Sequence, residues 1–348
     1  MTDAATDGVA TNGADLIVIG AGPAGMAAAA VAAAQGLRVA LLDEQAGPGG
    51  QVFRAVTGAG AGRGAILGAD YLRGAALAEG LRAPGVRHLP GAAVWAIEAS
   101  GPGFVATFSR EGRAAQIAAG ALILATGALE RPVPVPGWTL PGVMTAGAGQ
   151  ILLKSSGLVA DRAVLAGAGP LLYLLAAQMV RAGVPPLALV ETCGRADLIR
   201  ALPRLAAGLR GWRVVLKGLV LLAELRRAGV RRITGATDLR IEGGGGGGRA
   251  EALAFRAGGR DQRIACDTVL LHQGVVANTQ ASRLLRIDHD WHEGQRAFVP
   301  RCDGWGETAL RGLFIAGDGA GIAGALAAEA AGRLAALQVA CRLGRITP

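Results

Sequence analysis

Residues 16–43 read LIVIGAGPAGMAAAAVAAAQGLRVALLD, and this stretch decides the fold. An apolar run leads into a glycine-rich turn, an alanine-rich segment follows, and a second apolar run ends on a carboxylate. This order predicts a β-strand, a tight turn, an α-helix and a second strand, the unit that binds the ADP half of a dinucleotide. A membrane span is the alternative for so apolar a run, but its internal glycines, its proline and its weakly hydrophobic alanines argue against it.

Each residue of the turn has its own physical task. We expect Gly20 to make the tight turn, Gly22 to let the backbone approach a pyrophosphate, and Gly25 to let the helix lie close on the strand. Pro23 suits the first helical turn, where its missing N–H costs nothing. The free N–H groups and the positive end of the helix dipole then face the phosphates. Asp43 ends the second strand, where it can accept hydrogen bonds from ribose hydroxyls.

Composition places the chain among globular proteins with a large apolar core. Its 348 residues are 51% hydrophobic and 18% charged, and this length is enough for two domains. The net charge of +9 comes from scattered arginines, so nucleic-acid binding is not expected, while attraction to anionic membranes or an acidic partner stays open. Residues 1–13 are polar, which predicts a disordered leader and neither a secretory signal nor an anchor. We expect a cytoplasmic protein without a membrane span.

Cysteines and histidines give no sign of a redox pair or a metal site. The four cysteines lie far apart, so none forms a CxxC pair, a zinc spacing or an iron–sulfur run. His289 and His292 have a spacing that suits a metal, but no third ligand accompanies them, and a solvated loop is the expected structure. No metal is predicted.

The glycine turn occurs a second time. Gly167 begins a similar turn 147 positions after Gly20, and a helix and a strand ending on Glu191 follow it. The closing strand of each half keeps the same offset, because Gly274 follows Gly127 by 147 positions. Two nucleotide-type folds in tandem explain this pattern.

Between each turn and its closing strand lies a segment suited to a small antiparallel layer. In the first half, residues 93–99, 104–108 and 114–118 are strand-like and are separated by turn residues. In the second half, the glycine hexamer at residues 243–248 predicts a hairpin tip. It is not a phosphate loop, because no Lys-Ser/Thr pair follows it.

The chain then returns to the first fold. A strand ends in Gly317-Asp318, and a helix is expected to open at Gly321 and to run to about Leu343. This helix would close the first domain, so the second fold is inserted within it. We predict an α/β protein of two Rossmann-like, three-layer ββα dinucleotide-binding domains, formed by residues 14–150 with 295–348 and by residues 151–294.

Three ordered motifs resemble those of the two-dinucleotide-domain flavoproteins, the class that contains thioredoxin reductase and glutathione reductase. They are Gly20-x-Gly22-x-x-Gly25, Ala125-Thr126-Gly127 and Gly317-Asp318. Within this class the chain looks like the α (A) subunits of opine oxidase, hydroxyproline dehydrogenase and hydrogen cyanide synthase complexes. The segments that carry this closer likeness are residues 42–45, 48–54, 125–132, 136–143, 153–157 and 271–280.

The resemblance implies FAD in the first domain. Asp43 would lie at the adenosine ribose, Gly50 and Gln51 beside the ribityl chain and flavin, and the backbone near Val94 at the adenine. Asp318 would bind the ribityl or phosphate end, with an ordinary helix N-cap as the alternative role. The last helix would point its N-terminus at the flavin pyrimidine ring, where negative charge develops on reduction. The cofactor residues implied in this way are Gly20, Gly22, Pro23, Ala24, Gly25, Asp43, Glu44, Gly50, Gln51, Val94, Ala125, Thr126, Gly127, Gly317 and Asp318.

The second fold departs from the dinucleotide pattern. Its third glycine position is Leu172, and a larger residue there weakens the case for NAD(P). Glu191 would accept a hydrogen bond from a ribose and would repel a 2′-phosphate, which disfavours NADP. NAD(H), an ATP-like nucleotide and an empty site remain open.

The resemblance implies an FAD-dependent oxidoreductase, the α subunit of a heteromeric amine or imino-acid dehydrogenase of the opine or hydroxyproline type. Its partners would be an FAD-oxidase-like subunit and a small iron–sulfur subunit, since full-length relatives often continue into a cysteine-rich domain whereas this sequence ends at Pro348. The missing cysteine pair excludes a disulfide-reductase mechanism. The alternatives are a free-standing NADH-dependent reductase of the ferredoxin-reductase type and a non-catalytic nucleotide-bound scaffold.

No residue is assigned a catalytic role from the sequence. His272 follows the closing strand of the second fold, where a catalytic role is the less favoured interpretation. Glu130 and Arg131 are expected to form an ion pair that steadies the crossover between domains.

Overall fold

The computed structural model describes residues 13–201, 203, 211–244 and 248–347. The predicted leader therefore lies, apart from Gly13, outside the described residues. The chain folds as two compact units, and each is described by itself. Unit 1 comprises the described parts of Met1–Gly60, Gly68–Leu129 and Val275–Pro348, and unit 2 comprises those of Ala61–Leu67 and Glu130–Gly274.

The two units divide the chain after residues 129 and 274, whereas the sequence led us to expect divisions after residues 150 and 294. The reason lies in strand pairing. Strand β8 (Val143–Thr145) joins the sheet of unit 2 by pairing in parallel with β15 (Thr268–Gln273). Unit 2 is an insertion within unit 1, and the predicted α/β class with two Rossmann-like folds is confirmed.

The sheet of unit 1 is built around one long strand. Strand β6 pairs antiparallel with β5 over its first part and parallel with β1 over its last part, and β19 also pairs with it in parallel. The strand predicted at 114–118 and the closing strand are thus one continuous element, which corrects the expectation of two. The strands in sheet order are β3 (Val86–Pro90), β2 (Val39–Asp43), β1 (Ala14–Ile19), β6 (Arg113–Leu124), β5 (Gly103–Arg110) and β4 (Ala93–Ser100), with β19 (Leu313–Ile315) on β6.

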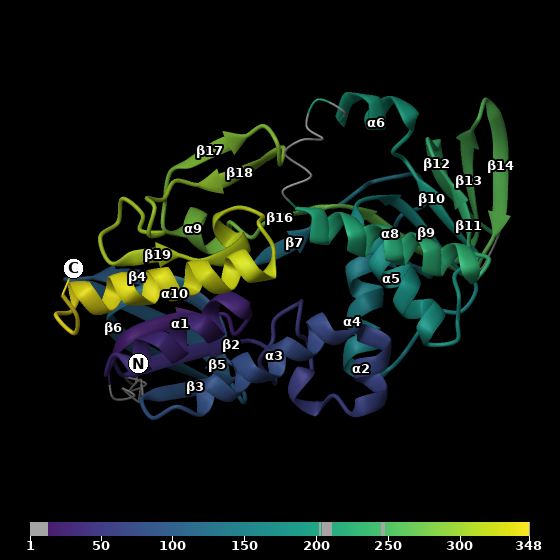
Figure 1. The fold of residues 1–348 in the computed structure, drawn as a ribbon. Helices are drawn as coiled ribbons and strands as arrows, with labels where there is room; N and C mark the ends of the chain where they lie inside the picture. Colours follow the sequence, from purple (N-terminus) through teal and green to yellow (C-terminus); the bar gives the residue numbers. More distant parts are fainter. Residues whose placement is uncertain (1–12, 202, 204–210, 245–247, 348) are drawn as a thin grey trace, which may run out of the picture. The chain divides into compact units, whose positions relative to one another are not determined.

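Side chains of β1 alternate between two layers that cover the sheet. Ile17 and Ile19 join a buried cluster with Phe104 and Phe108 of the antiparallel layer. Two helices, α1 and α10, lie side by side on the other face (Figure 1). The helices of unit 1 are α1 (Pro23–Ala34), α3 (Ala69–Glu79), α9 (Gln280–Leu284) and α10 (Ala325–Arg342), and its smaller strands are β16 (Val275–Ala277), β17 (His289–His292) and β18 (Ala297–Pro300).

Unit 2 repeats this three-layer plan. Its five strands are all parallel in the order β11-β10-β9-β15-β8, and a three-stranded antiparallel layer lies beside them (Figure 1). Val164 and Ala166 of β9 pack against the antiparallel layer, whereas Leu165 between them packs against the helices. The elements of unit 2 also include α2 (Ala61–Leu67), α4 (Ala146–Ser156), β9 (Ala163–Ala168), α5 (Pro170–Arg181), β10 (Ala188–Glu191), α6 (Arg195–Ala201), α8 (Trp212–Arg227), β11 (Arg231–Ile233), β12 (Thr237–Gly243), β13 (Ala250–Ala257) and β14 (Arg260–Ala265).

The structure also shows where three predicted segments lie. The last helix begins at Ala325 and not at Gly321, because a 3₁₀ turn (Gly317–Ala320) and a left-handed Gly324 precede it. His289 and His292 lie in β17, which pairs with β18, and not in a loop. The glycine hexamer joins the paired strands β12 and β13, although its central residues 245–247 lie outside the described residues.

Helices α1 and α10 approach closely because small residues line their contact. Gly332 of α10 sits so near the carbonyl of Ala24 that a Cβ at this position would overlap it. Neighbouring alanines of both helices are buried. Close packing of this kind resists added volume.

We predict that Gly332→Ala lowers the free energy of unfolding by about 1–3 kcal/mol, because the helices must separate to fit the methyl group. The control is Gly218→Ala in α8, where a Cβ meets nothing within 4 Å. It should gain about 0.5–1 kcal/mol from helix propensity. Urea titration followed by circular dichroism measures both, and equal stabilisation by the two substitutions would contradict the packing argument.

Candidate functional site

The parallel strands of unit 1 end at one edge of its sheet. In register, Ile19 pairs with both Leu42 and Leu124, and Leu124 also pairs with Ile315, so four strands finish together. The chain then continues from each strand into a loop at this edge. Crevices at the carboxyl ends of parallel strands are where α/β sheets bind ligands.

The first loop depends on two glycines that admit no side chain. Gly20 has a left-handed φ of 103°, and a Cβ here would overlap the carbonyl oxygen of Ala125. A Cβ on Gly25 would overlap the carbonyl oxygen of Gly20. The turn and the first turn of α1 are therefore in backbone contact with the end of β6.

Gly22 differs from these two glycines because it faces open space. Its backbone is extended, with φ of −75° and ψ of −174°, and a Cβ would meet only the Cα of Gly50, at 3.9 Å. Gly50 is itself left-handed, and its neighbour Gly49 donates a hydrogen bond of 2.8 Å to the carbonyl of Ala21. Two glycine turns thus pack together and leave a backbone-lined cradle.

The start of α1 presents hydrogen-bond donors to this cradle. Gly22 is the N-cap, Pro23 follows it, and no side chain of the described residues caps the first turn. The first helical hydrogen bond is donated by Met26 to Gly22. The N–H groups of Ala24 and Gly25 precede it, and such groups with the helix dipole bind phosphate.

Asp43 ties the cradle to the second strand. Its carboxylate is buried, and its two oxygens accept hydrogen bonds from the N–H groups of Ala21 and Gln45, the latter at 2.7 Å. Each carboxylate oxygen has a second lone pair, so this fixed orientation leaves acceptor capacity. Glu44 is exposed beside it and accepts a hydrogen bond from its neighbour Gln45 at 3.0 Å.

The segment before Val94 lies beside the end of β2. Gly91 and Ala92 donate backbone hydrogen bonds of 3.0 and 2.8 Å to the carbonyls of Gln45 and Asp43. The ladder of β4 with β5 shifts register just after Val94. The predicted adenine-side backbone therefore lies at the same sheet edge as Asp43.

A third segment follows β6. The hydroxyl of Thr126 donates to the carbonyl of Asn278 at 3.3 Å, and Asn278 donates its N–H to the carbonyl of Gly127 at 2.9 Å. Gly127 is left-handed, with φ of 67°. Asn278, far along the chain, therefore holds the Ala125-Thr126-Gly127 motif in place, and this contact was not predicted from the sequence.

The fourth segment follows β19. A Cβ built on Gly317 would lie 2.9 Å from the Cβ of Ala24, so this turn packs against α1. One oxygen of Asp318, Oδ1, accepts from the N–H groups of Ala323 and Gly324 at 3.0 Å each. Asp318 thus holds the loop that leads into α10, whereas the N-cap of that helix is Gly324, which no side chain of the described residues caps. Oδ2 of Asp318 accepts no hydrogen bond from the residues the structure describes.

His88 also lies near this edge of the sheet. His88 lies on β3 opposite Leu41, and its buried Nε2 finds no hydrogen-bond partner among the described residues. Burial lowers the pKa of the His88 imidazole, and the charge of Asp43 opposes this shift.

These residues fit a dinucleotide. A backbone cradle without side chains, N–H donors at a helix start and a fixed carboxylate at the second strand are what a diphosphate bridge and a ribose require. All fifteen predicted cofactor residues belong to unit 1, and the loops that carry most of them meet at this edge. Gln51 is exposed next to Gly50.

Unit 2 has a similar glycine turn and a carboxylate at the end of its second strand, but a side chain occupies that carboxylate. Gly167 and Gly169 are left-handed, and Leu172 is buried in the apolar core. Glu191, the counterpart of Asp43, is 3% exposed and pairs with Arg232 at 2.8 Å. Burial raises the pKa of Glu191, and Arg232 opposes that shift. A carboxylate held in this way is less free to accept from a ribose.

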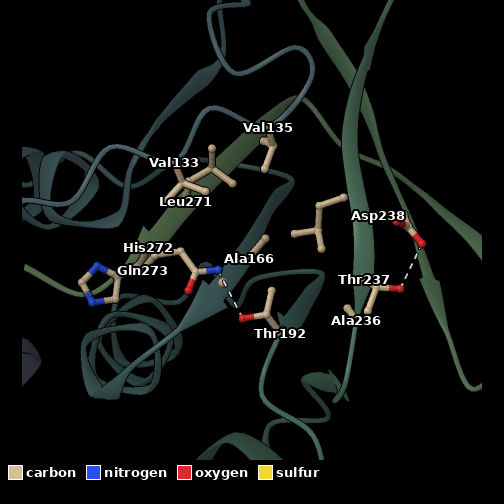
Figure 2. Close-up of a pocket in the computed structure, with 12 residues that line it drawn as sticks. Val133, Val135, Ala166, Thr192, Ala236, Thr237, Asp238, Leu271, His272 and Gln273 are labelled. Carbon is tan, nitrogen blue, oxygen red and sulfur yellow. Dashed lines mark hydrogen bonds between the residues drawn. The ribbon is translucent and has the colours of Figure 1, made fainter. Parts of the chain in front are cut away.

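A cavity of about 250 Å³ lies in unit 2 at the ends of β9, β10 and β15. Figure 2 shows its polar groups: Gln273 donates to Thr192 at 3.2 Å, and Thr237 donates to Asp238 at 3.1 Å. The rest of its lining is largely apolar. The imidazole of His272 points away from these groups.

Glu130 contacts a histidine far along the chain. Its carboxylate lies 2.5 Å from Nδ1 of the buried His272 and accepts from the N–H of Gly147 at 2.8 Å. The predicted Glu130–Arg131 ion pair stays a prediction. The backbone N–H of Arg131 donates to the carbonyl of Gly274, so the two segments that connect the folds are joined by a backbone hydrogen bond.

Neither a disulfide nor a cluster of metal-ligating side chains is found among the residues that the structure describes. All four cysteines are free, and burial raises the pKa of the Cys302 thiol to about 11. No group of three metal-ligating side chains occurs among residues 13–201, 203, 211–244 and 248–347. In the same part of the chain, no helix is long and apolar enough to cross a membrane.

The fold and the unit 1 site define a dinucleotide-binding flavoprotein with two Rossmann-like folds. The chain belongs to the pyridine nucleotide-disulphide oxidoreductase family, whose profile matches residues 14–344. It is an FAD-dependent oxidoreductase, as predicted.

Several known proteins resemble the chain in sequence. The opine oxidase A-type subunit of Agrobacterium tumefaciens (strain Ach5) is 46% identical over 332 residues, which cover 93% of this chain and 64% of that protein. The hydrogen cyanide synthase subunit HcnB of Pseudomonas aeruginosa is 32% identical over 344 residues, covering 95% and 72%. The predicted likeness to these proteins is confirmed, and the chain spans about two thirds of their length.

Solved structures share the fold. Thioredoxin reductase of T. acidophilum matches with a TM-score of 0.67 at 19% identity, covering 96% of this chain and 99% of that one. L-proline dehydrogenase from P. horikoshii matches with a TM-score of 0.66 at 17% identity, covering 95% and 56%.

We predict that Gly22→Val weakens FAD binding roughly 100-fold or more, because the side chain takes the space where phosphate would meet two N–H groups, each worth about 1.5–3 kcal/mol. The thermal stability of the apoprotein should hardly change, since Gly22 has ordinary dihedral angles and open space. The readout is the ratio of flavin absorbance to protein after purification.

The matched control is Gly47→Ala, a neighbouring loop glycine whose Cβ meets nothing within 4 Å. It should retain FAD. Full retention by Gly22→Val would show that the cradle is not the diphosphate site.

Proposed function

We propose that the chain is the FAD-bearing subunit of a heteromeric dehydrogenase that acts on an amine or imino acid. When bound, FAD supplies an acceptor for the hydride removed from a carbon that bears nitrogen. The chain itself contributes the cradle of unit 1 and a helix start aimed toward it. A partner of the FAD-oxidase type and a small iron–sulfur protein complete the proposed complex.

The observation that supports the proposal is a backbone cradle that fits a diphosphate, in a chain whose four described cysteines form no dithiol. The described cysteines are free and dispersed between an exposed site, a buried site and two half-buried sites. A disulfide reductase needs a reactive pair of thiols, and a thiol with a raised pKa is a poor nucleophile. Electrons would therefore leave this chain by a carrier other than a cysteine pair.

Similar proteins support the same conclusion. Those at 30–46% identity carry the names of oxidase or synthase subunits, namely opine oxidase, hydrogen cyanide synthase and sarcosine oxidase. Because the chain spans about 64% of the length of two of the opine oxidase subunits, substrate and partners are carried over as proposals only.

A second candidate is an NADH-dependent flavin reductase. The left-handed Gly167 and Gly169 and the neighbouring cavity favour a nucleotide in unit 2. The Glu191–Arg232 pair and the buried Leu172 weigh against a nicotinamide dinucleotide. An ATP-like nucleotide would use the same glycine turn.

We predict that dye-linked oxidation of an opine, hydroxyproline or glycine requires co-expression with a partner protein encoded beside this gene. The chain alone should bind FAD but show less than about a hundredth of that rate, because the groups that bind the amine are supplied by the partner. Anaerobic dye reduction measures both samples.

The control is the same complex carrying Gly22→Val, which should assemble and remain inactive. Rapid anaerobic bleaching of the isolated chain by NADH would support the reductase instead. Equal amine oxidation with and without the partner would contradict the subunit role.

A further inference from the structure

Helix α8 of unit 2 carries a row of large apolar side chains on its outer face. Trp212, Val215, Leu216, Leu219 and Val220 are each 48–58% exposed. Their spacing of three and four residues places them on one side of the helix. Soluble proteins seldom leave so many apolar groups together in water, so this face, called the α8 stripe, points to an interaction.

The opposite face of α8 packs into the apolar core of unit 2. Leu221 and Leu225 are buried in an apolar cluster that also contains residues of α5. The two helices lie side by side (Figure 1). The α8 stripe is therefore not needed to hold the helix in place. At 100° per residue, Val215 and Val220 mark the edges of an arc of about 140°.

Basic residues surround the α8 stripe. Arg213 and Lys217 lie one helical turn apart along one flank, and Arg226 and Arg227 lie at the C-terminal end, all exposed. The one acidic residue of the helix, Glu224, is bound by Arg181 through two hydrogen bonds of 2.7 Å. The whole chain is basic as well, with a net charge of +9.

We propose that the α8 stripe docks on an anionic lipid surface. A helix with an apolar face that includes Trp and with basic flanks lies in the plane of a membrane interface. A second copy of the chain fits poorly, because the same basic flanks would meet one another. A wide convex arc suits a flat lipid surface better than a groove that takes one row of anchors. The contact is peripheral, since no described helix can span the membrane.

The test is sedimentation of the FAD-loaded chain with vesicles of phosphatidylglycerol and phosphatidylethanolamine at a ratio of about 1:3, chosen to give an anionic surface. The chain should bind them at low salt, bind phosphatidylcholine vesicles far less, and dissociate at high salt. Leu216→Ser with Leu219→Ser should weaken binding by about tenfold for each leucine. Arg213→Gln with Lys217→Gln should weaken it by about fivefold for each charge.

The matched control is Leu72→Ser with Leu334→Ser, two exposed leucines of α3 and α10 in unit 1, which should leave vesicle binding unchanged. Flavin content and melting temperature should not move in either leucine pair, so failure here is separate from failure of the proposed function. The proposal is overturned if the chain ignores anionic vesicles, or if the α8 substitutions do not reduce binding. It is also overturned if those substitutions abolish only assembly with the co-expressed partner, which would make the stripe a protein interface.

Discussion

The structure of unit 1 depends on backbone contact at the end of its central strands. The carbonyl of Gly20 lies where a side chain on Gly25 would have to be, and the carbonyl of Ala125 lies where one on Gly20 would have to be. This contact brings the start of α1 down onto β1 and β6. It also orients the first N–H groups of the helix toward the cradle beside Gly22, so one steric constraint serves both packing and binding.

Local rules explain why much of this could be predicted. The strand, turn, helix and strand at residues 16–43 follow from apolar runs and glycine positions, and the structure has β1, α1 and β2 there. The order of the three motifs predicts that their loops lie at one edge of the sheet, because parallel strands end on the same side. An offset of 147 residues was enough to recognise a second unit of the same plan.

Contacts between distant residues could not be predicted in the same way. Glu130 and His272 are 142 positions apart, and nothing local distinguishes this pair from Glu130 and its neighbour Arg131. Asn278 likewise meets Thr126 only through the folded chain. The sequence does carry one signal for such contacts: Gly91-Ala92 and Gly235-Ala236 follow β3 and β11, and each pair donates to residues at or just after the end of the second strand of its unit. The start of α10 was missed because a left-handed Gly324 delays it.

The two units share one fold plan but differ at the carboxylate that ends the second strand. Asp43 accepts from backbone N–H groups, whereas Glu191 is held by a side-chain cation, and this changes what each can offer to a ribose. We propose that the unit 1 cradle binds the ADP half of FAD. The most direct measurement is displacement of FAD from the reconstituted apoprotein by ADP and by FMN, followed by flavin fluorescence. We expect one FAD per cradle, displacement by ADP and none by FMN. Displacement by FMN but not by ADP would show that the cradle does not bind the ADP half.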